Sequence, residues 1–506
     1  MAMRTLKLHK KKLLLFTITV LISVICYLLF SQNNYELMTL FPIQNYDQHI
    51  SNWIKPTDAD YDKPLLTTAQ QKVRKEELNQ RYFGKKSPWS PEYINKIFSQ
   101  PAPEDLISAE LEKISTFNNK NKPDNEIGYG PNFRPYDEQW INNIINNINL
   151  SQFKNLHYES SHRGITIDNL QARLLPTDDV FFYNHKLAGE GYPFDNLQAT
   201  TIWAGTPIYI LGKTTDQSWS FVLTPNFIAW VKSNGVAMVD DNFVNQWQQK
   251  AQIHLAAITD TKFSIIDAET GTYRFTGYIG MLLPMDINGD GLRVLIPVVD
   301  VDRHAKIYHA ELAKKQAVSV PLLPTPHHFA DIFSHLIQRP YGWGGMYFNN
   351  DCASELKNIF TVFGIYIPIH SSTQVDPERF LVKNVDISNA TMDERLAYLA
   401  NNGHKFMTIV YIGGHVFLYL GKYTNQKDHS SVILTYQNMW SLKPKNIDSR
   451  SVIGGAVLFP LLKSYPENSQ LVSPADKSKF QLGYLDQPVE EMIQTTKINM
   501  RADVSP

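Results

Sequence analysis

Cys352 is the residue of this chain whose type and surroundings best suit covalent chemistry. Apolar residues at helical spacing follow it, and Asp351 is a typical helix N-cap, so the pattern predicts a helix with Cys352 in its first turn. At that position the helix dipole and the free backbone N–H groups favour a thiolate and can bind an oxyanion. Cys352 is therefore a candidate nucleophile, and a buried, inert thiol is the alternative.

A cysteine nucleophile needs a base, and His415 is the candidate. Gly413 and Gly414 precede it and alternating apolar residues follow it, which predicts a histidine at the start of a strand. Gln437 ends the next apolar run, where its amide carbonyl can hold the imidazole in the required tautomer. A single strand histidine is most often structural, but this order of cysteine, histidine and glutamine favours nucleophilic catalysis.

Two other motifs resemble ligand sites but lack a required residue. The run from Asp286 to Gly291 begins like a calcium loop, but Pro297 stands where a bidentate glutamate is needed. Gly212-Lys213-Thr214 resembles the end of a phosphate loop, but Pro207 replaces its first glycine. The sequence therefore predicts no metal site and no cofactor.

The composition indicates a folded, multidomain globular protein. The 506 residues are 43% hydrophobic and 19% charged, which excludes a disordered or fibrous chain. The 48 Lys and Arg residues nearly balance the 49 Asp and Glu residues, so no nucleic-acid partner is expected.

The N-terminus predicts a membrane anchor. Basic residues precede an uncharged run, 13–30, whose helix would be about 27 Å long and would nearly span the hydrocarbon core. We expect a periplasmic or cell-envelope protein held in the inner (cytoplasmic) membrane by residues 13–30, with a cleaved signal peptide as the alternative. Cys352 is the one cysteine beyond this run, which excludes a disulfide within the exported part.

The texture of the sequence changes along the chain, which predicts a multidomain α+β protein. Helical patterns come first, then short apolar runs typical of small β-barrels, and then a mixed region with Cys352 and His415. The predicted parts are a signal anchor or signal peptide (1–31), a polar stalk (32–80), a helical N-terminal domain (81–160), two barrels (161–240 and 241–315), an α+β catalytic domain (320–465) and a polar tail (466–506).

Four segments around the candidate residues form a recognisable signature: PYGWGG (340–345), DC (351–352), GGHVFLYLG (413–421) and YQNMW (436–440). They resemble the NlpC-type family of bacterial cell-wall cysteine peptidases, which have a reduced papain-like fold. Upstream, segments 173–177, 189–198 and 205–207 resemble the first bacterial SH3-like domain of multidomain members. The resemblance implies a helical N-terminal region, two small SH3-like β-barrels and a C-terminal papain-like α+β catalytic domain.

The resemblance also implies an activity. Such enzymes cut peptidoglycan stem peptides or muropeptides between γ-D-glutamate and a diamino acid such as diaminopimelate. Carried over position by position, Cys352 is the nucleophile, His415 the general base and acid, and Gln437 the third catalytic residue.

Four further residues are expected to bind substrate. Tyr341 is expected near the oxyanion or substrate, and Asp351 is expected to help bind a free N-terminal amine of the stem. Glu190 or Tyr192 of the first barrel is expected near that amine, at the far end of the cleft.

Two departures from the family pattern leave alternatives open. Ala353 replaces a common serine, and Gln437 replaces a common histidine, although glutamine can still accept the imidazole N–H. The alternatives are a non-catalytic peptidoglycan-binding protein and a Cys–His amidase or acyltransferase on another substrate. The expected partners are peptidoglycan and the membrane, and the oligomeric state stays open.

Overall fold

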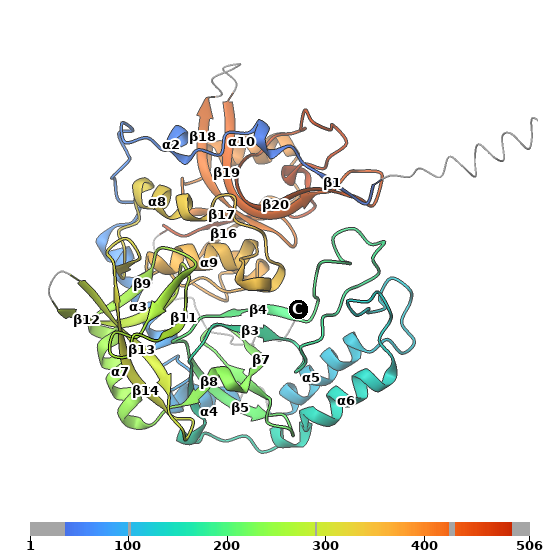
Figure 1. Cartoon of the computed structure of the whole chain (residues 1–506). Coiled ribbons are helices and arrows are strands. Elements are labelled where there is room, and N and C mark those ends of the chain that lie inside the picture. The colour runs from blue at the N-terminus through green and yellow to red at the C-terminus, as the bar shows by residue number, and fades with distance from the viewer. Residues whose placement is uncertain (1–35, 100–102, 289–290, 425–430, 488–506) are drawn as a thin grey trace, which may run out of the picture.

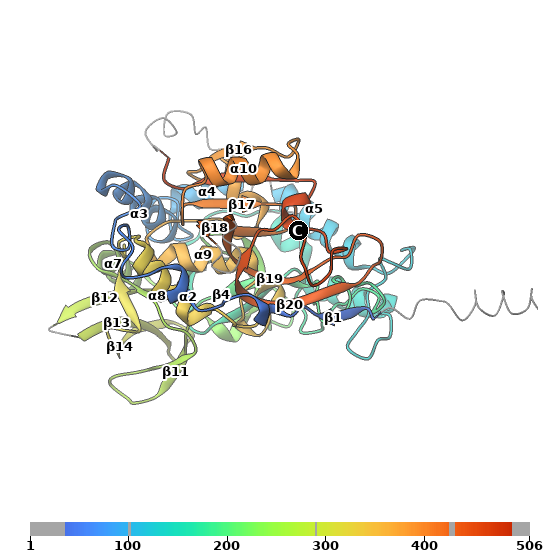
Figure 2. The same cartoon turned by 90° about the horizontal axis from the view of Figure 1, so that it is seen from above.

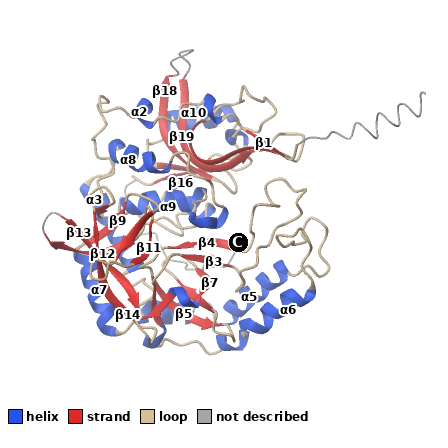
Figure 3. Ribbon diagram, in the orientation of Figure 1, coloured by secondary structure: helices blue, strands red, loops and turns tan. Residues whose placement is uncertain are grey.

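The computed structural model of the chain describes residues 36–99, 103–288, 291–424 and 431–487. A large sheet with α8, α9 and α10 lies at the top of Figure 1, two smaller β domains lie below it, and α5 and α6 lie beside them. Figure 3 shows the same division between strand-rich and helical parts.

The upper part is built on a seven-stranded sheet with the order β1-β20-β19-β18-β17-β21-β16. Neighbouring strands in this sheet are antiparallel, except that β1 and β20 are parallel. The bounds are β1 Met38–Leu40, β16 Lys383–Asp386, β17 Thr408–Tyr411, β18 Val416–Thr424, β19 Ser431–Leu442, β20 Arg450–Pro460, β21 Gln481–Tyr484, α8 Pro326–Leu336, α9 Cys352–Val362 and α10 Met392–Asn402.

The apolar stripe of α9 joins this helix to the sheet. Leu356, Ile359 and Phe360 are buried in the same core as Val416 and Leu418 of β18. The sequence periods explain the contact, because the helix turns its stripe toward the sheet while β18 presents alternate residues to the helix.

The prediction of a polar stalk over 32–80 is wrong for the described residues from 36 on. β1 pairs with β20, and α3 (Thr68–Tyr82) buries Leu78 in the main core together with Ile54 and Leu66. The short helical segments between them are η1 Ile43–Asn45 and α2 Ile50–Trp53. The few apolar residues of this segment show little periodicity because they pack against elements far away in the sequence.

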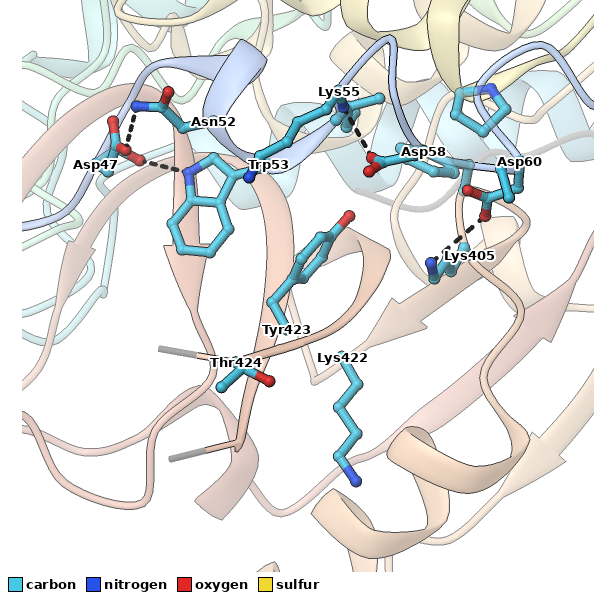
Figure 4. A pocket seen from close by; sticks show the side chains of 14 residues that line it. Asp47, Asn52, Trp53, Lys55, Asp58, Asp60, Lys405, Lys422, Tyr423 and Thr424 are labelled. Carbon is cyan, nitrogen blue, oxygen red and sulfur yellow. Dashed lines mark hydrogen bonds and ion pairs between the residues drawn. The ribbon is translucent and has the colours of Figure 1, made fainter. Parts of the chain in front are cut away.

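Figure 4 shows where this N-terminal segment packs against the end of β18. The rings of Trp53 and Tyr423 meet edge to face with centroids 5.5 Å apart, and Lys405 pairs with Asp60 at 3.5 Å. These residues help to line a cavity of about 650 Å³. The segment is therefore an integral part of the fold around this sheet.

The predicted polar tail, 466–506, is wrong for residues up to 487. β21 lies between β17 and β16, and Leu482 and Leu485 are fully buried. The predicted domain end at 465 is therefore also wrong. A single short apolar run between polar residues gives too weak a pattern to indicate a central strand.

The first β domain, residues 163–238, is a seven-stranded sheet with the order β4-β3-β7-β6-β5-β2-β8. Helices α4 (Pro91–Ser99), α5 (Pro103–Phe117) and α6 (Glu138–Ile148) share a core with its residues Tyr209 and Trp230. The strands are β2 Arg163–Thr166, β3 Leu170–Arg173, β4 Gln198–Ile202, β5 Pro207–Lys213, β6 Trp219–Leu223, β7 Ile228–Lys232 and β8 Val236–Met238, and η2 Leu150–Phe153, η3 Ser160–His162 and η4 Ser233–Gly235 are short helical turns.

The second β domain, residues 255–319, has the sheet order β14-β13-β12-β9-β15 and a separate β10–β11 hairpin, which projects from the body in Figure 2. The predicted end of this domain at 315 is too early, because β15 lies beyond it. Residues 241–253 form α7 (Asp241–Ile253), capped by Asp240, and β15 continues to Ser319. The strands are β9 Leu255–Ile258, β10 Phe263–Ile266, β11 Tyr273–Gly277, β12 Leu282–Asn288, β13 Gly291–Val299, β14 Ala305–Leu312 and β15 Ala317–Ser319.

The predicted membrane anchor, 13–30, lies outside the described residues. Within the part of the chain that the structure describes, each helix is too short or too polar to cross a bilayer.

Candidate active site

Helix α9 begins at Cys352 because Asp351 caps it. Asp351 Oδ1 accepts hydrogen bonds from the backbone N–H groups of Ala353 and Ser354 at 3.1 and 2.8 Å. The Ser354 hydroxyl donates to the same oxygen at 2.8 Å and accepts from the Asp351 N–H at 2.9 Å, which completes a capping box. Since Oδ1 takes all three bonds, Asp351 Oδ2 has no hydrogen-bond partner among the described residues.

The Cys352 side chain is 7% exposed and faces the start of β18. Its sulfur accepts from the backbone N–H of Val416, the residue after His415. Burial and the Asp351 carboxylate raise the pKa of the thiol to about 12, although backbone N–H groups oppose this rise. The expectation of a helix-stabilised thiolate is therefore wrong for this structure, because desolvation outweighs the helix terminus.

The imidazole of His415 contacts the side-chain amide of Gln437. The Nε2 atom of His415 lies 3.0 Å from Oε1 of Gln437, which is 1% exposed. Burial lowers the pKa of His415 to about 4; the bond to Gln437 raises it and Lys477 lowers it. At neutral pH the imidazole is uncharged and its Nδ1 remains for a proton from the thiol.

No hydrogen bond joins His415 to Cys352 among the residues that the structure describes. The sulfur contacts the backbone of Val416, the residue after His415, where α9 meets the start of β18. Catalytic hydrogen bonds are commonly long in unliganded enzymes and shorten when substrate binds.

Tyr341 lies beside Cys352. Its backbone N–H donates to Gly454 O of β20 at 2.9 Å, which holds the preceding loop against the sheet. Burial, and then the nearby Cys352 and Asp351, raise the pKa of the Tyr341 phenol. The phenol is therefore a neutral hydrogen-bond donor next to the sulfur.

A loop of the first β domain reaches the same place. The Phe194 ring packs edge-on against Trp343 and Trp440, with centroids 5.4 and 5.1 Å away. The Ala188 N–H donates to Asp448 at 3.4 Å, which ties the loop to residues just before β20. Phe194 and Trp440 are thus site residues that the sequence analysis did not single out individually.

Glu190 and Tyr192 lie on the same loop but make different contacts. The Tyr192 ring is 54% exposed and packs against Phe133 and Phe182 at 5.9 and 5.4 Å, toward the helical N-terminal region. Glu190 is exposed, and its backbone carbonyl accepts from Asn196. The residue of this loop that packs on the rings beside Cys352 is therefore Phe194.

A buried carboxyl group supports the site from behind. Glu355, one turn after Cys352, accepts from the Tyr436 hydroxyl at 2.5 Å and from the Asn350 amide at 2.6 Å. Burial raises the pKa of Glu355 to about 7. Glu355 thus joins α9 to the strand that carries Gln437.

The cavity of Figure 4 is separate from these residues, because it lies at the Tyr423 end of β18 while His415 precedes the other end. Within the described ranges, no group of three or more His, Cys, Asp or Glu side chains is arranged to hold a metal ion.

Comparisons with known proteins agree with this architecture. A model of the N-terminal NLPC_P60 stabilising domain matches residues 21–153, and models of SH3 domains of the SH3b1 and SH3b2 types match 181–232 and 240–286. The solved structure of an NlpC/P60 endopeptidase from Photobacterium damselae subsp. piscicida has a TM-score of 0.75 and 26% identity, over 88% of this chain and 99% of that chain. The chain matches multidomain NlpC/P60 proteins in its domains and in their order. The predicted multidomain form with two SH3-like domains is confirmed.

Two other solved NlpC/P60 structures resemble the chain less. An NlpC/P60 family protein from Bacillus cereus ATCC 10987 has a TM-score of 0.38 and 16% identity, over 55% of this chain and 81% of that chain. NlpC2 from Trichomonas vaginalis has a TM-score of 0.21 and 13% identity, over 54% and 92% of the two chains. A comparison with curated protein sequences gives no match.

Proposed function

We propose that this NlpC/P60 protein is a cysteine endopeptidase that cleaves peptidoglycan stem peptides at the γ-D-glutamyl–diamino acid bond. The observation that carries the proposal is the placement of Cys352 at the start of α9, against the residue after His415, with His415 bonded to Gln437. A helix cysteine, a strand histidine and a strand amide on an antiparallel sheet are the parts of a papain-like site.

The proposed reaction starts from a neutral Cys–His pair. His415 Nδ1 takes the proton of Cys352 as the sulfur attacks the γ-glutamyl carbonyl carbon, so that an S–C bond forms and the carbonyl oxygen becomes an oxyanion. The Cys352 backbone N–H and the Tyr341 hydroxyl are the candidate oxyanion donors. His415 then gives the proton to the leaving amine and the C–N bond breaks; it next activates a water that hydrolyses the thioester.

Asp351 is the proposed partner of the substrate's free amino end. Its Oδ1 is occupied by the helix cap, while Oδ2 has no hydrogen-bond partner among the described residues. A carboxylate oxygen suits a charge-assisted hydrogen bond from an ammonium group. We propose Glu190 and Tyr192 as further contacts at the far end of the cleft, and the SH3-like domains as contacts with peptidoglycan.

We also propose that the enzyme works in the cell envelope, held in the inner membrane by residues 13–30. The basic flank and uncharged run of the sequence support this placement. Membrane fractionation of cells carrying the full chain or a chain with Leu21→Arg tests it: the full chain should pellet with membranes, and equal recovery of both in the soluble fraction would contradict the anchor.

The deciding experiment is mass spectrometry of products. The purified chain and its Cys352→Ala variant are each incubated with L-Ala-γ-D-Glu-diaminopimelate and with digested peptidoglycan. We expect release of L-Ala-γ-D-Glu by the parent chain alone, with an unchanged circular dichroism spectrum of the variant. Full activity of the variant would remove the cysteine mechanism.

The same experiment separates the alternatives. Intact peptides in every sample, together with retention of the folded protein on peptidoglycan, would favour the non-catalytic binding protein. Cysteine-dependent release of ammonia, or transfer to an added amine without cleavage at γ-D-glutamate, would favour the amidase or acyltransferase.

A further inference from the structure

The orientation of the Gln437 amide is set by a chain of hydrogen bonds that begins at a backbone carbonyl. The Thr435 hydroxyl lies 2.6 Å from Phe459 O on the neighbouring strand. A carbonyl oxygen can only accept, so the hydroxyl proton must point to Phe459. The hydroxyl oxygen of Thr435 is then available only as an acceptor toward other groups.

The next bond transmits this polarity to Gln437. Its amide lies 2.8 Å from Thr435 Oγ1, and because that oxygen accepts, the amide must present its NH₂ group there. The carbonyl of Gln437 therefore faces the other way, toward His415 Nε2 at 3.0 Å. Thr435 and Gln437 are 0% and 1% exposed, so water does not compete for these bonds.

The last step concerns the histidine. Because Gln437 Oε1 can only accept, His415 Nε2 must carry the proton and Nδ1 must keep its lone pair. A reversed amide would place the proton on Nδ1, and that nitrogen could not accept a proton from the thiol. The chemical competence of the histidine thus depends on a threonine that touches neither substrate nor sulfur.

We infer that Thr435 is a positioning residue that selects the Nε2–H tautomer of His415 by fixing the Gln437 amide. Its side chain lies on the same face of β19 as Gln437, two residues away, as the strand period requires. The consequence for catalysis rests on the proposed function, whereas the tautomer itself does not.

The first test is the tautomer of the unmodified protein. In the full chain with ¹⁵N-labelled histidine, His415 is assigned by comparison with a His415→Ala sample, and its ring nitrogens are observed at pH 7. We expect a protonated Nε2 and an unprotonated Nδ1. A dominant Nδ1–H form would overturn the inference, whether or not the protein hydrolyses any peptide.

The second test compares Thr435→Val with Thr435→Ser. Valine keeps the shape but frees the amide to reverse, so we expect a mixed His415 tautomer and a loss of kcat of about 10- to 100-fold, as for other lost outer hydrogen-bond partners. KM should change by less than about 3-fold, since Thr435 does not contact substrate, and serine should restore both the tautomer and kcat. Wild-type kcat and tautomer in the valine variant would contradict the inference.

A double-mutant cycle tests whether Thr435 acts through Gln437 or through a general effect on the fold. In a Gln437→Ala background, Thr435→Val should cause no further loss of kcat, because the amide that it orients is gone. Multiplying losses in the double variant would show that Thr435 acts through the fold and not through Gln437. If the valine variant does not fold, the tautomer of the parent chain and the serine variant still decide the matter.

Discussion

At the scale of single residues, burial keeps the two candidate catalytic groups uncharged. Burial raises the pKa of Cys352 to about 12 and lowers that of His415 to about 4, so the thiol and the imidazole are both neutral over a wide pH range. A neutral thiol in a closed site also reacts more slowly with oxidants and other thiols than a thiolate does. In the proposed mechanism, proton transfer to His415 creates the thiolate during the reaction.

The lowered pKa of His415 predicts an unusually acidic working range. The base must be unprotonated, so kcat/KM should stay high as the pH falls from 7 to 5 and should decrease only near pH 4, below the ordinary histidine value of 6.5. The pH–rate profile with the tripeptide measures this limb. Glu355→Gln is the control, because Glu355 also titrates, near pH 7, and its replacement should leave the fall in kcat/KM near pH 4 unchanged. A fall in kcat/KM of the parent chain near pH 6.5 would contradict the neutral, buried histidine.

Asp351 combines two roles that two variants separate. Asn is as good an N-cap as Asp, so Asp351→Asn should keep thermal stability but raise KM at least about 10-fold for a peptide with a free amino end. Asp351→Ala should also lower the free energy of unfolding by about 1 kcal/mol. Equal KM values for the parent and Asp351→Asn, measured with free and N-acetylated peptides, would exclude the ammonium contact.

At the scale of elements, the C-terminal segment after β20 belongs to the site. The buried Arg395 of α10 donates to Ala475 O and Lys477 O at 2.9 and 2.6 Å, which holds the segment in place. Lys477 is close enough to His415 to lower its pKa. A segment with no catalytic motif thus lowers the pKa of the candidate base.

Removing the charge of Lys477 should shift the acidic side of the pH–rate profile. In Lys477→Gln the imidazolium loses an unfavourable neighbour, so the pKa of His415 rises and the fall in kcat/KM occurs at higher pH. Lys479→Gln is the matched control, since Lys479 is exposed on the same segment. Identical pH profiles for the two variants would show that Lys477 does not act on His415.

At the scale of the whole molecule, a buried arginine links the N-terminal segment to the C-terminal end of the described chain. Arg74 of α3 is 2% exposed and donates to Leu381 O and to Leu485 O, directly after β21. Burial lowers the pKa of its guanidinium to about 10, which still leaves it charged at neutral pH. The N-terminal segment therefore stabilises the sheet on which His415 and Gln437 lie.

Loss of this arginine should destabilise the fold more than the activity. Arg74→Met leaves two buried carbonyl groups without their donor, at a cost of about 3 kcal/mol in the free energy of unfolding. Urea titration followed by tryptophan fluorescence measures the change, with the exposed Lys72→Met as the control. A difference below about 0.5 kcal/mol between the two variants would contradict the clamp.

Local patterns in the sequence were enough to predict which elements carry the candidate site residues. The N-cap Asp351, the helix that begins at Cys352, the strand after His415 and the amide of Gln437 all depend on neighbours a few residues away, and the structure has each in the expected element. Thr435 could also have been found, because it precedes Gln437 by one strand period, but its role depends on Phe459 of another strand.

Other features of the protein depend on long-range packing and could not be predicted from local sequence patterns. β1 and β21 are short and become strands only because β20, β17 and β16 offer them unpaired edges. The pKa of Cys352 depends on burial by elements distant in sequence, which reverses the expectation from the helix terminus. The local sequence pattern thus identifies the candidate reactive groups, whereas their protonation, their neighbours and the limits of the domain follow from long-range packing that no local period encodes.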